Sequence, residues 1–159
     1  MAQLADGQLF LKINPAQNSI AAIVRHMAGN MLSRFTDFLT TDGEKPDRDR
    51  DGEFVTVAGA TRGDIEARWN VGWTALERTL AALRPDDLLR PVRLQGESIP
   101  VIEALGRALV HMAQHAGQIV LLSKHHAGPW WQTLSIPRGQ SAQYNAAAQP
   151  SGAQLEDPA

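Results

Sequence analysis

The sequence contains no cysteine. This absence excludes disulfide bonds, thiolate nucleophiles and the zinc sites that use cysteine ligands. Any metal ion that the protein binds must therefore be held by histidine, aspartate or glutamate side chains.

The chain also lacks a concentrated charge and a long apolar run. Its 15 basic and 17 acidic side chains are mixed along the sequence and give a formal net charge of −2, so no positive field is available for a phosphate backbone. No apolar run approaches the ~20 residues that span a bilayer, and "MAQLADGQLFLK" has no basic segment followed by an apolar one. We expect a cytoplasmic protein that binds neither nucleic acid nor a membrane.

The apolar residues that are present recur with the period of helices. With 159 residues and 43% hydrophobic content, the chain has material for one domain with a core. Steps of three and four between apolar residues predict long helices over residues 18–39, 61–85 and 98–127. We therefore expect an all-α fold, with one helical domain over residues 1–145 and a disordered tail over residues 146–159.

Residues typical of helix ends mark these segments. Asn18 or Ser19 caps the first, and Thr61 followed by Asp64 three residues later is typical of a capping box for the second. Gly128 stops the third. The connector "PDDLLRPVRLQGESIP" predicts a short turn at residues 86–89 and an extended piece at residues 92–94.

A dense run of charges, "TTDGEKPDRDRDGEF", follows the first helix and interrupts all periodicity. Its glycines and proline favour a long exposed loop. An EF-hand calcium loop beginning at Asp47 would need a bidentate glutamate at its twelfth position, where Ala58 stands. A solvated charge run is the favoured interpretation, and a calcium site is not expected.

Two histidines, His111 and His115, lie four residues apart in the apolar stretch "LVHMAQHAGQIVLL". On a helix they share one face and can point at a common ion. Spacing alone favours an ordinary structural role for such a pair. A zincin-type protease needs glutamate directly after the first histidine, and Met112 occupies that position.

A catalytic zinc-type site needs a third protein ligand. Two of the other histidines, His125 and His126, follow His115 by ten and eleven residues on the same helix, a rise of roughly 15 Å that no shared ion can bridge. His26 is the remaining histidine and lies at the flank of the first helix's apolar stripe. On spacing alone it is explained better as a structural histidine than as a ligand.

Several separated motifs resemble those of one bacterial family. They are "NSIAAIVRHMAGN", "FLTTDGEKPDRDRDGEF", "HMAQHAGQIVLLSKH" and "WWQTLSIPRGQSAQYN", which occur in the same order over roughly residues 7–145. The family is DUF1572, within the DinB-like superfamily. The resemblance implies an up-down-down-up four-helix bundle that binds a divalent metal ion through His26, His111 and His115.

The sequence departs from the family at its beginning, where the resemblance implies a whole helix before "LADGQLF" and few residues precede that segment. Either the natural chain starts earlier, or the bundle has three long helices. In the second case its exposed core edge must be covered in another way, such as by a homodimer.

Enzymes of the wider superfamily are bacillithiol S-transferases and mycothiol-dependent isomerases. The resemblance therefore implies a metal-dependent transferase that uses Zn²⁺ or Ni²⁺, a small electrophilic substrate and a low-molecular-weight thiol. The alternatives are a metal-dependent hydrolase, a non-catalytic metal- or ligand-binding bundle and an interaction domain with three structural histidines. In the non-catalytic case, a carboxylate such as Asp37 or Glu103 closes the coordination sphere. No further catalytic residue is predicted.

Overall fold

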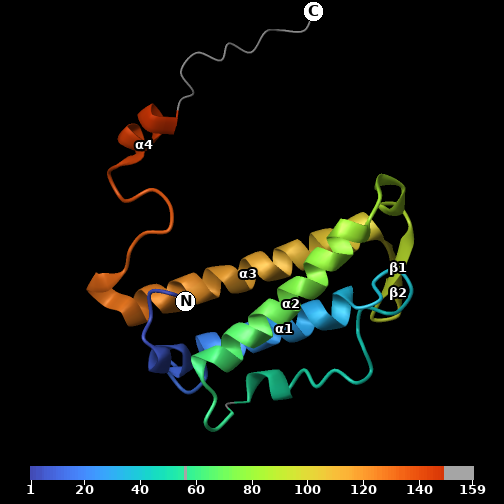
Figure 1. Ribbon diagram of the computed structural model, residues 1–159, viewed down its shortest axis with the longest axis horizontal. Coiled ribbons are helices and arrows are strands. Elements are labelled where there is room, and N and C mark those ends of the chain that lie inside the picture. Colours follow the sequence, from blue (N-terminus) through green and yellow to red (C-terminus); the bar gives the residue numbers. More distant parts are fainter. Residues whose placement is uncertain (56, 149–159) are drawn as a thin grey trace, which may run out of the picture.

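The computed structural model of the protein describes residues 1–55 and 57–148. Three long helices form its body: α1 (Ile20–Phe35), α2 (Arg62–Ala82) and α3 (Val101–Ala127) (Figure 1). A short helix, α4 (Ser141–Ala148), extends away from these three, and a small hairpin joins α2 to α3. The protein is mostly helical, as predicted, but the hairpin means that it is not purely α.

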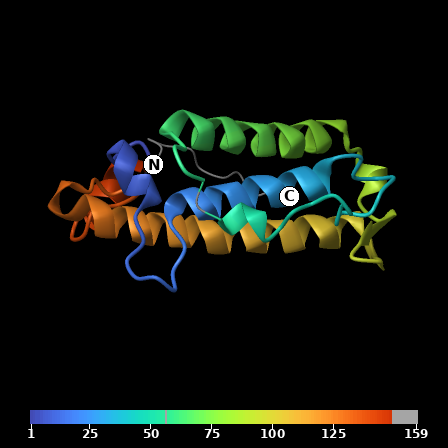
Figure 2. The same ribbon diagram turned by 90° about the horizontal axis from the view of Figure 1, so that it is seen from below.

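Helix α1 lies between α2 and α3 (Figure 2). Near the ends of α1 and α2, Thr79 Oγ1 donates a hydrogen bond to the Phe35 carbonyl over 2.7 Å, so these two helices run in parallel. Helix α3 runs the opposite way, because its last turn lies beside the segment that precedes α1: Gln8 Nε2 donates to the His126 carbonyl over 2.7 Å. Helices α1 and α2 therefore run in the same direction, and α3 runs in the opposite direction.

The capping residues predicted from the sequence are confirmed. Ser19 Oγ accepts a hydrogen bond from the Ala22 amide, and Thr61 forms a reciprocal capping box with Asp64. Gly128 ends α3 with a positive φ of 53°. Helix α1, however, stops at Phe35, short of the predicted residue 39, and the residues that follow it turn back over the end of the helix.

The connector between α2 and α3 contains more structure than the sequence predicted. A 3₁₀ turn (Pro85–Asp87) precedes strands β1 (Pro91–Leu94) and β2 (Glu97–Pro100), which pair in antiparallel fashion. The extended piece predicted at residues 92–94 is confirmed as β1, while β2 was not predicted. Gln95 and Gly96 join the strands with φ values of 54° and 80°, which is the geometry of a two-residue hairpin turn.

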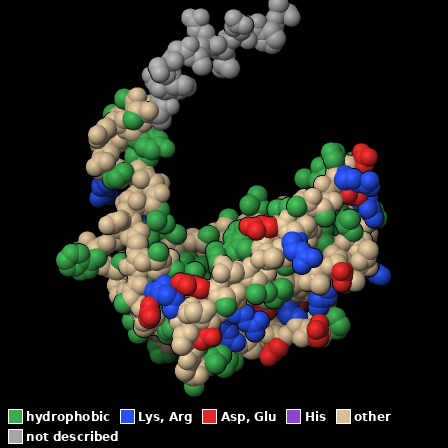
Figure 3. All heavy atoms as spheres, in the orientation of Figure 1, with side chains coloured by type: hydrophobic (Ala, Val, Ile, Leu, Met, Phe, Trp, Pro, Cys, Tyr) green, Lys and Arg blue, Asp and Glu red, His purple; other side chains and the backbone are tan. Residues whose placement is uncertain are grey.

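The core is centred on α1. Buried side chains on both flanks of α1 pack against buried side chains of α2, α3 and β1. Helix α1 contributes Ile20, Val24, Met27 and Met31, and the other elements contribute Ile65, Leu76, Val92, Ala104, Ala108 and Ile119. Helices α1 and α2 approach closely at Gly72, where a Cβ atom would lie 2.8 Å from the Ala28 Cα. Both signs of charge are interspersed on the face seen in Figure 3, as the mixed sequence indicates.

The predicted tail is covered only in part. Residues 146–148 belong to α4, and residues 149–159 lie outside the described residues. Among the residues that are described, no helix has the length and apolar character required to cross a bilayer.

Candidate metal centre

Three histidines from two helices converge at one point. His26 projects from α1 and is buried, while His111 and His115 project from α3 and are half-buried. Each contributes a ring nitrogen, and these three nitrogens lie within 4.8 Å of one another. The sequence singled out the same residues, and the antiparallel packing of α1 against α3 brings them together.

The closest pair of nitrogens already has the spacing of two ligands to one ion. His26 Nε2 and His111 Nε2 are 3.1 Å apart. Two nitrogens bound to one ion at ~2.0–2.1 Å in tetrahedral geometry lie roughly 3.3 Å apart. An ion therefore fits between these two rings without a rearrangement of the helices.

The outward nitrogens of two rings are held by hydrogen bonds. His26 Nδ1 lies 2.8 Å from Glu53 Oε2, and His115 Nδ1 lies 2.8 Å from Gln118 Oε1. An ionised carboxylate only accepts hydrogen bonds, so the His26 proton is on Nδ1 and the lone pair of Nε2 faces the other histidines. Carboxylate partners of this kind orient metal-binding histidines in proteins.

Glu53 is itself held by Arg48. The guanidinium donates from Nε and Nη2 to the two carboxylate oxygens, each over 2.9 Å. Burial alone would raise the pKa of the Glu53 carboxyl, but the hydrogen bonds from His26 and Arg48 keep this pKa below its ordinary value. The expectation of a solvated charge run is therefore wrong for Glu53 and Arg48, whose side chains are 11% and 6% exposed.

The backbone around Glu53 is fitted to α1. A Cβ atom on Gly29 would lie 2.0 Å from Glu53 Oε1, so glycine at this position leaves the space for the carboxylate. The next residue, Phe54, stacks on the His26 ring with a centroid distance of 4.7 Å. Arg25 donates hydrogen bonds to the carbonyls of Gly52 and Val55. These contacts fix the short 3₁₀ helix Gly52–Phe54 against α1.

The electrostatic surroundings keep two of the imidazoles neutral. Burial is the main cause that lowers the pKa of His111 to about 4, and electrostatic interactions with His115, His26, Arg34 and Arg48 lower it further. Burial also lowers the pKa of His115, although its bond to Gln118 opposes the shift. Both rings are therefore neutral at pH 7, the form that binds metal ions.

The other residues considered from the sequence are not part of this group. His125 and His126 lie in the last turn of α3. Asp37 follows α1 in a left-handed conformation, with a φ of 49°. Glu103 accepts a hydrogen bond from Arg107 on the exposed side of α3. Glu53 was not predicted, and no local pattern in the charge run distinguishes it from its neighbours.

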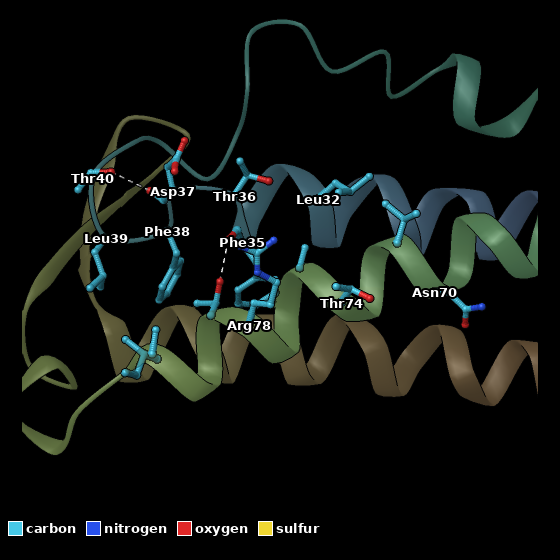
Figure 4. A pocket seen from close by; sticks show the side chains of 15 residues that line it. Leu32, Phe35, Thr36, Asp37, Phe38, Leu39, Thr40, Asn70, Thr74 and Arg78 are labelled. Atoms are coloured by element: carbon cyan, nitrogen blue, oxygen red, sulfur yellow. Dashed lines mark hydrogen bonds between the residues drawn. The ribbon is translucent and has the colours of Figure 1, made fainter.

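A large hollow lies away from the three histidines. A cavity of about 700 Å³ is formed by the end of α1, by α2 and by the turn that includes Asp37 (Figure 4). Its only titratable lining residues are Asp37 and Arg78, which lie on different elements. A second hollow of about 540 Å³ reaches Glu53 and Arg48 but none of the three histidines. The three converging histidines therefore line neither cavity.

Comparison with known proteins relates the chain to one protein family. A family model described as "Protein of unknown function (DUF1572)" matches residues 1–140. No curated protein and no solved structure matches the chain.

We predict that Gly29→Ala lowers the free energy of unfolding by about 2–4 kcal/mol. The added methyl group would displace the Glu53 carboxylate and leave Arg48 and His26 without their partner in a largely buried site. Urea unfolding measures the change. Gly63→Ala is the matched control, because its Cβ would meet only Thr61 Oγ1 at an ordinary 3.6 Å. Equal stabilities of the two variants would refute this role of Gly29.

We also predict a pH dependence in the metal-free protein. Because the pKa of His111 is lower in the folded state than the ordinary 6.5, the unfolded chain binds this proton more readily as the pH falls. Stability is therefore lost between pH 6.5 and about pH 4, by on the order of 2 kcal/mol after allowance for partial exposure. Urea unfolding in the presence of a chelator tests this, since His111→Gln should show a shallower loss. Parallel curves for the two proteins would contradict it.

Proposed function

The chain belongs to the DUF1572 family, and we propose that it is a metal-dependent enzyme that binds one divalent ion through His26, His111 and His115. The convergence of the three ring nitrogens carries this proposal. The bond from His26 Nδ1 to Glu53 supports it, because that bond leaves Nε2 unprotonated and directed at the other two rings.

The chemistry of the donor set fits a divalent ion. With the His26 proton on Nδ1, its Nε2 atom is an acceptor. The 3.1 Å contact to His111 Nε2 then requires either a proton on that His111 nitrogen or an ion bound to both nitrogens. The depressed pKa values of His111 and His115 mean that few protons compete with the ion at pH 7. Three imidazoles suit Zn²⁺ or Ni²⁺, the ions that we propose.

The site is of the open type. Within residues 1–55 and 57–148, the group of converging ligands contains these three histidines and no fourth histidine or carboxylate. Structural zinc sites are closed by four protein ligands, whereas catalytic sites have three and keep one position for water or substrate. The donor count therefore favours catalysis over a purely structural ion.

The directions of the helices support the finer proposal of a DinB-like bundle. In an up-down-down-up bundle, the last three helices have two parallel members followed by one that is reversed. Helices α1, α2 and α3 have this order, with one of the three converging histidines on α1 and the other two on α3.

We propose that the reaction is the transfer of a small thiol to an electrophile. A divalent ion at this site would lower the pKa of a thiol that binds to it. Arg34 and Arg48 add positive charge near His111, which favours an anionic thiolate at the same place. The thiolate sulfur forms a bond to the electrophilic carbon, the leaving group departs with its electron pair, and the thiol proton passes to solvent.

Arg34 is suited to receive an anionic group of the thiol or the electrophile. Its Nε and Nη1 atoms are buried and have no hydrogen-bond partner within the described part of the chain. A buried donor without a partner destabilises the protein, and an anion that accepts its hydrogen bond relieves this. Guanidinium groups recognise carboxylates in this manner.

We predict that protein purified without a histidine tag contains about one equivalent of metal, measured by elemental analysis. Each of His26→Ala, His111→Ala and His115→Ala should reduce the content at least tenfold, because two imidazoles hold an ion far more weakly than three. His125→Ala is the matched control, since it removes a histidine from the same helix as two of the ligands. Equal metal content in all five proteins would overturn the proposed site.

We predict that the metal-loaded protein consumes small thiols in the presence of alkylating electrophiles, and that a chelator or His115→Ala abolishes the activity. Arg34→Gln should raise KM for substrates that carry a carboxylate by roughly tenfold or more, consistent with the loss of a charge-assisted hydrogen bond. Mass spectrometry of the products measures the transfer. Hydrolysis of esters without thiol transfer would indicate a hydrolase, and a metal that only raises the melting temperature would indicate a non-catalytic protein.

A further inference from the structure

The outer face of α3, directed away from α1, exposes large aliphatic side chains. Val110 and Leu121 are 69% and 68% exposed. They are eleven residues apart, which is three helical turns, so they lie on one line along the helix. Figure 2 shows α3 at the edge of the three-helix layer, with this side free of the other long helices.

Two glycines lie on the same face. Gly106 and Gly117 are also eleven residues apart, and a Cβ atom on either would meet nothing within 4 Å. By contrast, Gly29 and Gly72 are required by contacts inside the chain. A glycine inside a helix costs about 1 kcal/mol relative to alanine. The packing of the described chain gives no reason for the two outer glycines, but a closely approaching second helix would.

We propose that a second copy of this chain packs here, with the two α3 helices antiparallel about a two-fold axis near Ala113 and Gln114. In this arrangement Leu121 of each copy lies opposite Gly106 of the other, and Val110 lies opposite Gly117. Each large side chain meets a glycine, and the symmetry repeats each contact twice. A parallel pair would place glycine against glycine and valine against valine.

The same register pairs opposite charges at both ends of the contact between the two α3 helices, which we call the seam. It places Glu103 of one copy opposite Lys124 of the other. Within one chain Glu103 is bonded to Arg107, and Lys124 has no carboxylate within 4.0 Å in the part of the chain that is described. Complementary charge and complementary size thus select a single alignment of this surface with itself, which favours a second copy over an unrelated partner.

The dimer and the metal centre are separate. His111 and His115 point toward α1, so pairing through the outer face leaves both histidines free to bind an ion. The seam extends over roughly 32 Å of helix and is small beside the ~800 Å² that each partner buries in a standard interface. We therefore expect a dissociation constant in the micromolar range.

Cysteine cross-linking tests the register directly, because the chain has no cysteine of its own. In Val110→Cys/Gly117→Cys, the two new residues are roughly 10 Å apart along one helix, which is too far for a disulfide within the chain. Mild oxidation should give a covalent dimer on a non-reducing gel. Thr74→Cys/Ala81→Cys is the matched control, with the same spacing on the exposed side of α2, and should remain monomeric.

Sedimentation then tests the energetics. Gly117→Leu should weaken the dimer at least tenfold without lowering the melting temperature, because a Cβ atom at this position meets nothing within 4 Å in the described part of its own chain. Glu103→Lys and Lys124→Glu should each weaken the dimer, and the double variant should restore it. A wild-type protein that stays monomeric well above micromolar concentration, or a dimer unaffected by Gly117→Leu, overturns the proposal.

Discussion

The hydrogen bond between the Glu53 carboxylate and His26 Nδ1 organises the candidate centre and the long segment that follows α1. It sets the tautomer of His26 and thereby the direction of its free lone pair. It also explains why Gly29 lacks a side chain and why Arg48 is buried, since both accommodate the same carboxylate. A buried charge needs partners, and these residues supply them within one short stretch of α1 and the loop.

The central position of α1 makes this arrangement possible. One side of the helix packs so closely on α2 that only a glycine fits at position 72. Another side brings His26 to the histidines of α3, and the Glu53 segment covers the space beside them. A helix with neighbours in three directions has little free surface, which is why most of its residues are buried. The rigidity that follows is what a metal site requires, because small displacements of the ligands weaken binding.

Helix α3 has two faces with different properties. Its inner side carries His111 and His115, which meet His26. Its outer side carries exposed aliphatic residues and the two glycines that the packing of the described residues does not require. Since successive residues of a helix are 100° apart, a short sequence can serve both surfaces without conflict.

The parts of this protein that were predictable from the sequence rest on local physics. The caps at Ser19 and Thr61 and the stop at Gly128 involve hydrogen bonds or backbone angles within a few residues, so local sequence is sufficient. The four-residue spacing of His111 and His115 likewise places both on one face before any packing is known. Residues distant in sequence required the fold: His26 meets His111 across 85 positions and Glu53 across 27. Whether a charged side chain is solvated or buried depends on what packs over it, and no pattern within the charge run carries that information.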